Sequence, residues 1–71
     1  MEITLIKFGE RKREISLPDG TTIGQLLSIL GDPHRNGYTV RVGAHRIDDR
    51  DLERPLEPDD EVLIVPEVRG G

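Results

Sequence analysis

The chain has 71 residues, with ten basic and fourteen acidic side chains, a net charge of −4 and no cysteine. This length allows one small domain, near the lower limit for folding on a single core, and the lack of cysteine excludes disulfides and thiolate metal ligands. One tyrosine, one phenylalanine, no tryptophan and an acidic balance disfavour nucleic-acid binding, which favours a basic face with aromatic side chains.

The N-terminal part of the chain predicts two antiparallel strands. Residues 2–8 alternate between two faces, and Gly9 breaks the pattern. A second strand is expected from about residue 12 to residue 17, and these lengths suit a hairpin. The side chains expected on the inner faces are Ile3, Leu5, Ile15 and Leu17.

A helix is predicted after the turn formed by residues 18–20. Thr21 or Thr22 is expected to cap its start, and Gly31 is expected to close it. Pro33 prevents its continuation. Apolar residues recur with helical spacing and form one stripe, namely Ile23, Leu26, Leu27 and Leu30.

The second half of the chain predicts three further strands. Residues 34–37 are interpreted as a loop before a strand at 38–42, and residues 45–47 as a short edge strand. A single helical turn is expected around Leu52, and both Leu52 and Leu56 are expected to fill the bottom of the core. Residues 61–65 form the most continuously apolar run, which is typical of a central strand covered on more than one side. Pro66 ends that strand because it has no amide hydrogen to donate.

This order predicts an α+β domain over residues 1–66, with one helix packed across one face of a sheet. A flexible C-terminal tail is expected over residues 67–71. Fully extended, this tail spans about 16 Å at ~3.3 Å per residue, which is enough to enter a buried site in a partner. Its last two residues are glycines, which have no Cβ and therefore fit a narrow channel.

The order of elements, the run from Glu61 to Pro66 and the closing Gly70-Gly71 resemble the ubiquitin-like β-grasp family. The chain is most similar to the small sulfur carriers of molybdopterin and thiazole synthesis. The resemblance implies a mixed sheet of four to five strands. Those carriers usually have a glycine where this chain has Asp59, which leaves the type of that turn open. They also have a small residue before the diglycine, where Arg69 stands here as it does in ubiquitin.

The resemblance implies that the Gly71 carboxylate is activated by a ubiquitin-activating-like adenylating enzyme that uses ATP-Mg. A sulfur-carrier protein would then become a thiocarboxylate and donate sulfur through an accepting synthase, for cofactor biosynthesis or tRNA thiolation. A protein modifier would instead be conjugated through Gly71 to target lysines, for which Arg69 is the main argument. A third alternative is a β-grasp module that binds partners without covalent chemistry.

Partner recognition is expected from the tail and from one sheet face. Val68 would occupy an apolar pocket, and Arg69 would pair with a carboxylate or remain a solvated charge. Strand alternation gathers further exposed side chains on the face opposite the helix. We call these four residues the sheet-face patch: Ile6, Arg41, Leu63 and Val65.

We expect no catalytic residue, metal site or bound cofactor in this chain. His34 and His45 are the only histidines, and they lie far apart in the sequence without a metal-binding spacing. The sequence shows neither a signal-peptide pattern nor an apolar run near the ~18 residues of a membrane span, so a cytoplasmic location without membrane contact is expected.

Overall fold

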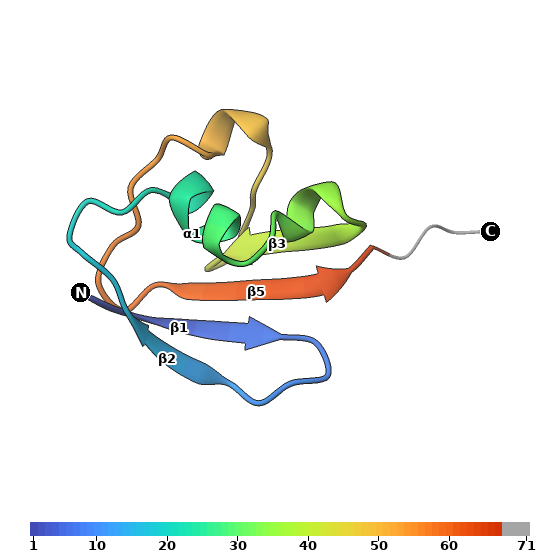
Figure 1. Ribbon diagram of the computed structural model, residues 1–71, viewed down its shortest axis with the longest axis horizontal. Coiled ribbons are helices and arrows are strands. Elements are labelled where there is room, and N and C mark those ends of the chain that lie inside the picture. The colour runs from blue at the N-terminus through green and yellow to red at the C-terminus, as the bar shows by residue number, and fades with distance from the viewer. Residues whose placement is uncertain (68–71) are drawn as a thin grey trace.

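The computed structural model describes residues 1–67. Its five strands form one mixed sheet in the order β2-β1-β5-β3-β4, in which β1 and β5 are parallel and the other neighbours are antiparallel (Figure 1). The α+β β-grasp arrangement predicted from the sequence is confirmed. The elements are β1 (Glu2–Lys7), β2 (Arg13–Ser16), α1 (Ile23–Ile29), a 3₁₀ turn η1 (Pro33–Arg35), β3 (Tyr38–Val42), β4 (His45–Arg46), a 3₁₀ turn η2 (Asp49–Asp51) and β5 (Glu61–Pro66).

The helix begins and ends where the sequence indicates. Thr22, rather than Thr21, is the N-cap: its hydroxyl accepts a hydrogen bond from the Gln25 amide, and the Gln25 side chain accepts one from the Thr22 amide. This reciprocal pair satisfies two amides that the first turn leaves without helical partners. Gly31 follows the helix with φ of +86°, a left-handed conformation that glycine adopts without steric cost.

One hydrophobic core lies between α1 and the sheet. Alternate residues of the three central strands point toward the helix, as the alternation predicts, and each fully buried aliphatic side chain contributes roughly 1.5–3 kcal/mol. The side chains with the least exposure are Ile3, Leu5, Leu26, Leu27, Val40, Val62 and Ile64. Leu56 is also buried, whereas Leu52 is half-buried against the core.

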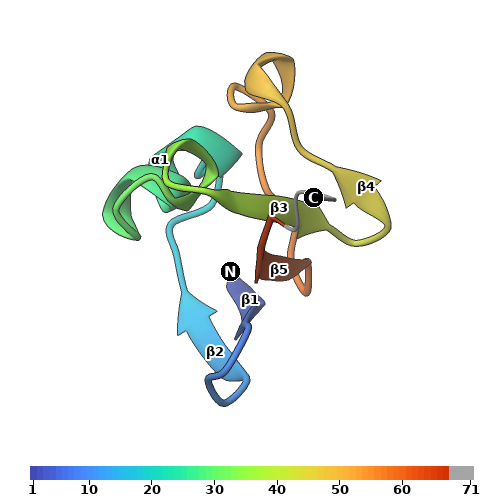
Figure 2. The ribbon, with the colours of Figure 1, turned by 90° about the vertical axis from the view of Figure 1, so that its right-hand side faces the viewer.

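Strand β5 is central, but it is covered on one face only. Val62 and Ile64 are buried under α1, whereas Leu63 and Val65 on the other face are half-buried. Figure 2 shows α1 on one side of the sheet, and no helix of residues 1–67 covers the opposite side. The prediction of a strand covered on more than one side was therefore wrong. Its apolar outer face is open.

The connections differ from the predictions in detail. The loop expected at residues 34–37 begins inside η1, because Pro33 fixes a backbone angle suited to a helical first turn. The helical turn expected around Leu52 is η2, which ends just before that residue. None of the helices in residues 1–67 has the length and apolar character to cross a membrane.

Asp59 adopts a left-handed conformation, which glycine enters most readily. Its φ is +66°, in the left-handed region, and its amide donates a hydrogen bond of 2.8 Å to the Glu2 carbonyl. Aspartate enters this region more readily than most residues with a Cβ. The turn before β5 therefore has a left-handed residue at Asp59, which answers the question that the sequence left open.

Candidate docking face and the exit of the tail

The predicted tail residues Val68, Arg69, Gly70 and Gly71 lie outside the described residues, but the strand that leads to them is well defined. In β5, Pro66 pairs with Tyr38 of β3, and the Glu67 amide donates a hydrogen bond of 2.8 Å to the Gly37 carbonyl. β5 is paired on both sides, with β1 and with β3. The chain is therefore held in the sheet up to Glu67, at the end of the molecule away from Met1 (Figure 1).

The structure brings the four residues of the sheet-face patch together. Leu63 of β5 lies between its two partners, Ile6 of β1 and Arg41 of β3, and Val65 follows two positions later on the same face. The three aliphatic side chains are half-buried and Arg41 is exposed. An apolar strip flanked by a cation therefore lies on the face opposite α1.

Phe8 extends this strip and was not included in the predicted patch. It is 70% exposed, directly after β1. Its amide donates a hydrogen bond of 2.9 Å to the Ile64 carbonyl, which continues the β1–β5 pairing by one residue. Because Phe8 has the same parity as Ile6, its ring belongs to the open face, opposite Val65. The alternation of residues 2–8 already indicated the face on which Phe8 lies. Its high exposure in the structure adds Phe8 to the apolar surface that is available for a partner.

The electrostatics of the β4–η2 corner centre on Asp51, whose side chain is only 13% exposed. One of its oxygens accepts a hydrogen bond of 3.0 Å from the Asp48 amide and lies 3.3 Å from His45 Nε2, and the other lies 3.4 Å from the Arg54 guanidinium. The hydrogen bond from the Asp48 backbone, followed by the Arg54 and His45 side chains, lowers the pKa of Asp51, while partial burial opposes the change. The carboxylate is therefore a structural anchor for η2.

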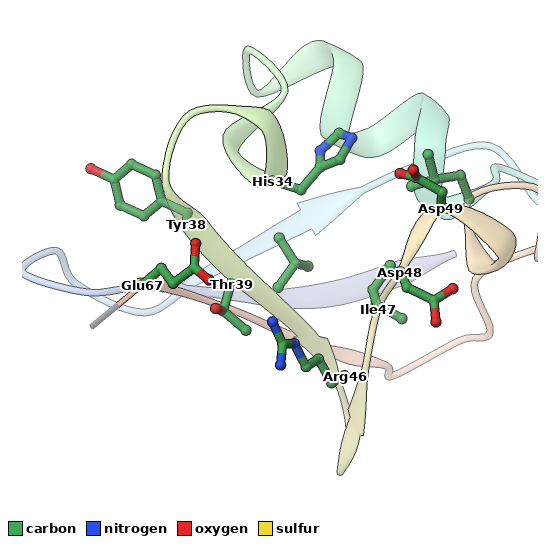
Figure 3. Close-up of a pocket in the computed structure, with 10 residues that line it drawn as sticks. His34, Tyr38, Thr39, Arg46, Ile47, Asp48, Asp49 and Glu67 are labelled. Atoms are coloured by element: carbon green, nitrogen blue, oxygen red, sulfur yellow. The ribbon is translucent and has the colours of Figure 1, made fainter. Parts of the chain in front are cut away.

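A hollow of about 280 Å³ lies between the β3 edge, η1 and η2 (Figure 3). His34 contributes to its wall, and both of its ring nitrogens are buried without a hydrogen-bond partner. His45 lies on β4 instead, beside Asp51. Residues 1–67 contain no group of three or more His, Cys, Asp or Glu side chains arranged to hold a metal ion.

The sequence matches the model of the ThiS family over residues 4–71, which is nearly the whole chain. The chain belongs to the ThiS family. The resemblance to small ubiquitin-like sulfur carriers, inferred from the order of elements and the diglycine, is thereby confirmed. No protein of curated function matches the sequence significantly.

Solved structures place this ThiS-family chain among ubiquitin-like folds. SAMP1 from Haloferax volcanii is similar with a TM-score of 0.74 and 17% identity, and 100% of both chains is covered. The complex of subunits 1 and 2 of molybdopterin-converting factor from Helicobacter pylori contains a chain with a TM-score of 0.73 and 24% identity, again over 100% of both. A ubiquitin from Caldiarchaeum subterraneum has a TM-score of 0.65 and 13% identity, over 100% of this chain and 98% of that one. At these identities the likeness establishes the fold.

Proposed function

We propose that this ThiS-family chain carries sulfur as a C-terminal thiocarboxylate on Gly71. The observation that carries the proposal is the family match, which extends through the diglycine to Gly71. In this role the chain is a substrate. Its partners, an adenylating enzyme and a sulfur-accepting synthase for cofactor biosynthesis or tRNA thiolation, supply the catalytic groups.

The chemistry of a carboxylate explains why a partner is needed. Its negative charge repels nucleophiles, and oxide is a poor leaving group. In the proposed first step a Gly71 oxygen attacks the α-phosphorus of ATP-Mg in the adenylating enzyme, which forms an acyl-adenylate and releases pyrophosphate. A sulfide equivalent supplied by a partner then attacks the acyl carbon, and AMP leaves with the former carboxylate oxygen. The product is the thiocarboxylate.

The fold supports this delivery. β5 is the central strand, and its pairing holds the chain up to Glu67, so that the tail residues begin from a fixed point. Glycines at positions 70 and 71 place no side chain near the reacting carbon. A partner that holds the body is therefore able to receive the carboxylate in a defined orientation, which lowers the entropic barrier to reaction.

The sheet-face patch and Phe8 are the proposed docking surface for that partner. Val65 lies only two residues before Glu67, so the apolar strip reaches the point where the described chain ends. A partner that covers Leu63, Val65 and Phe8 would lie beside the exit of the tail. Docking and delivery of Gly71 would then be parts of one binding event.

Conjugation to target lysines through Gly71 is the second candidate function. Arg69 before the diglycine is the feature that favours it, together with the fold likeness to the Caldiarchaeum ubiquitin. The planar guanidinium of an arginine at this position is able to donate two parallel hydrogen bonds to one carboxylate of a partner. The first step, activation of Gly71, is common to both functions.

Intact-mass measurement of the protein isolated from its own cells tests the two functions. A sulfur carrier shows a species ending at Gly71 that is heavier by the mass difference between sulfur and oxygen, and alkylation of the thiocarboxylate shifts this species further. A modifier shows branched peptides in which Gly71 is joined to lysines of other proteins. A variant with Gly71 deleted is the control and shows neither. Recovery of only the unmodified chain from cells that contain an active adenylating enzyme would contradict both functions.

A further inference from the structure

Two arginines lie directly opposite one another at one side of the open sheet face. In the β3–β4 hairpin, Arg41 pairs with Arg46, and both side chains are exposed. Directly opposed residues in an antiparallel pair have Cβ atoms about 5 Å apart. Figure 3 shows the Arg46 side chain extending from β4 alongside β3 toward Thr39, where it lines the hollow described above.

These two charges form no direct ion pair within residues 1–67. Lys7, Arg50 and Arg54 each lie within ion-pair distance of a carboxylate, whereas neither Arg41 nor Arg46 does so in residues 1–67. Like charges directly opposite each other destabilise a strand pair. A protein with a net charge of −4 therefore has two cationic side chains directly opposite one another in one strand pair.

The position of the pair relates it to the docking surface. Arg41 is the β3 partner of Leu63, so the cations border the apolar strip on its β3–β4 side. On the opposite side of the same face, β2 places Glu14 opposite Thr4 of β1. Glu61 of β5 is exposed and pairs with the same Thr4, so the face has cations along its β3–β4 border, aliphatic side chains in the centre, and acidic side chains at the start of β5 and on the β2 border.

We propose that the Arg41–Arg46 pair binds a carboxylate side chain of the partner protein that covers the apolar strip. A carboxylate between two guanidinium groups accepts charge-assisted hydrogen bonds from both and removes their mutual repulsion. The partner surface then has an apolar centre with Asp or Glu on the side that meets β3–β4. The identity of this partner rests on the proposed function, whereas the carboxylate site does not depend on Gly71.

The test is an NMR titration of the full-length chain, with nitrogen labelling, against a short poly-glutamate peptide blocked at both ends. The Nε–Hε resonances of Arg41 and Arg46 should shift together and saturate, and added salt should weaken the binding. Arg46→Gln should reduce the affinity about fivefold or more, because one of the two charge-assisted contacts is lost. Arg50→Gln is the matched control and should leave the affinity unchanged, since Arg50 lies on η2 beside Asp48.

Three results would overturn the proposal. One is an unchanged affinity in Arg46→Gln, and another is an equal shift of the Arg50 and Arg54 resonances. The third is an equal response to inorganic sulfate at matched ionic strength, which would indicate a small-anion site. A second measurement needs no ligand: Arg46→Glu should raise the midpoint of thermal unfolding, and an unchanged or lower midpoint would show that the two arginines do not repel each other measurably.

Failure of the proposed function is distinguishable from failure of this inference. A chain with Gly71 deleted should bind the peptide as the full chain does, although it has lost the carboxylate that the adenylating enzyme would use. If the full chain binds the peptide at Arg41 and Arg46 but never becomes a thiocarboxylate or a conjugate, only the proposed function fails. If the chain is thiocarboxylated but the peptide titration gives no arginine shifts, only the carboxylate site fails.

Discussion

Gly24 in the first turn of α1 lies in direct contact with Leu52, twenty-eight positions later in the chain. The Gly24 amide donates a hydrogen bond of 2.8 Å to the Leu52 carbonyl, and a Cβ at position 24 would lie 2.9 Å from the same oxygen. The neighbouring Ile23 amide donates to the Arg54 carbonyl at 2.9 Å. The segment after η2 thus accepts hydrogen bonds from the amides at the start of the helix, and it approaches the helix backbone as closely as only glycine permits.

Gly24→Ala should therefore destabilise the protein, by about 1–3 kcal/mol, because the methyl group overpacks this contact. Helix propensity alone gives the opposite expectation, a gain of about 1 kcal/mol. Chemical denaturation measures the change. Ser28→Ala, at an exposed position of the same helix, is the control and should give a small gain in stability. A more stable Gly24→Ala protein would show that the Leu52 segment moves away at little cost.

Asp59→Gly should stabilise the protein by roughly 0.5–1 kcal/mol, because a residue with a Cβ pays for its left-handed φ of +66°. The greater backbone entropy of glycine in the unfolded chain limits the gain. Asp59→Ala should lower the stability, since alanine enters this region less readily than aspartate. Thermal unfolding of the three proteins at one pH measures their stabilities, which should decrease in the order Gly, Asp, Ala at position 59. Any other order contradicts the argument that the left-handed backbone at this position is strained.

Asp51 should make the free energy of unfolding depend on pH in the acidic range. The folded-state pKa of Asp51 is lowered below its ordinary value of 3.8, so its stabilisation is complete above that value and is lost as the pH falls through the folded pKa. Asp51→Asn should therefore be less stable than the unmodified protein at pH ~7, and the difference should shrink as the pH falls below about 4. Urea midpoints across this range provide the measurement. Asp49→Asn serves as the comparison, and an equal pH dependence in both variants would contradict the assignment.

His34→Leu should stabilise the protein by about 1 kcal/mol, because two buried ring nitrogens without partners are replaced by apolar atoms of similar volume. His45→Leu should instead lower the stability, because His45 Nε2 lies 3.3 Å from the Asp51 carboxylate and the variant loses that contact. Denaturant midpoints at neutral pH compare the two. A loss of stability in His34→Leu would indicate that the imidazole has hydrogen-bond partners in solution.

Phe8→Ala should weaken docking to the adenylating enzyme about tenfold, because aromatic side chains that become buried in an interface contribute much of its binding energy. The chain offers a matched control in Ile29, which is 72% exposed on α1, compared with 70% for Phe8. Ile29→Ala should leave docking unchanged. The readout is kcat/KM for pyrophosphate release with each variant. Equal effects of the two substitutions would argue against the sheet face as the docking surface.

Much of the fold could be predicted from the sequence because its signals are local. The stripe of Ile23, Leu26 and Leu27 identifies the buried helix face, and alternation in residues 61–65 identifies Val62 and Ile64 as core. Features that depend on register were harder. The pairing of Arg41 with Arg46 follows from the length of one hairpin turn, and sequence spacing alone does not give it.

In the candidate site too, residues placed by local alternation could be predicted, whereas those that depend on tertiary packing could not. Ile6, Leu63 and Val65 could be placed on one face, because parity and strand order together determine their side of the sheet. The importance of Phe8 depends on how far the β1–β5 pairing continues, which is a tertiary property. The unpartnered nitrogens of His34 could not be anticipated, since they depend on how η1 packs beside the β3 edge.

The central place of β5 has a consequence for synthesis on the ribosome. Residues 61–66 are translated after every other strand, yet they pair with both β1 and β3, so a nascent chain without them has two separate hairpins and no continuous sheet. Completion of the domain must therefore await the emergence of its last strand from the exit tunnel. A translation product that stops before residue 61 therefore has the residues of both hairpins but not the strand that joins them into one sheet.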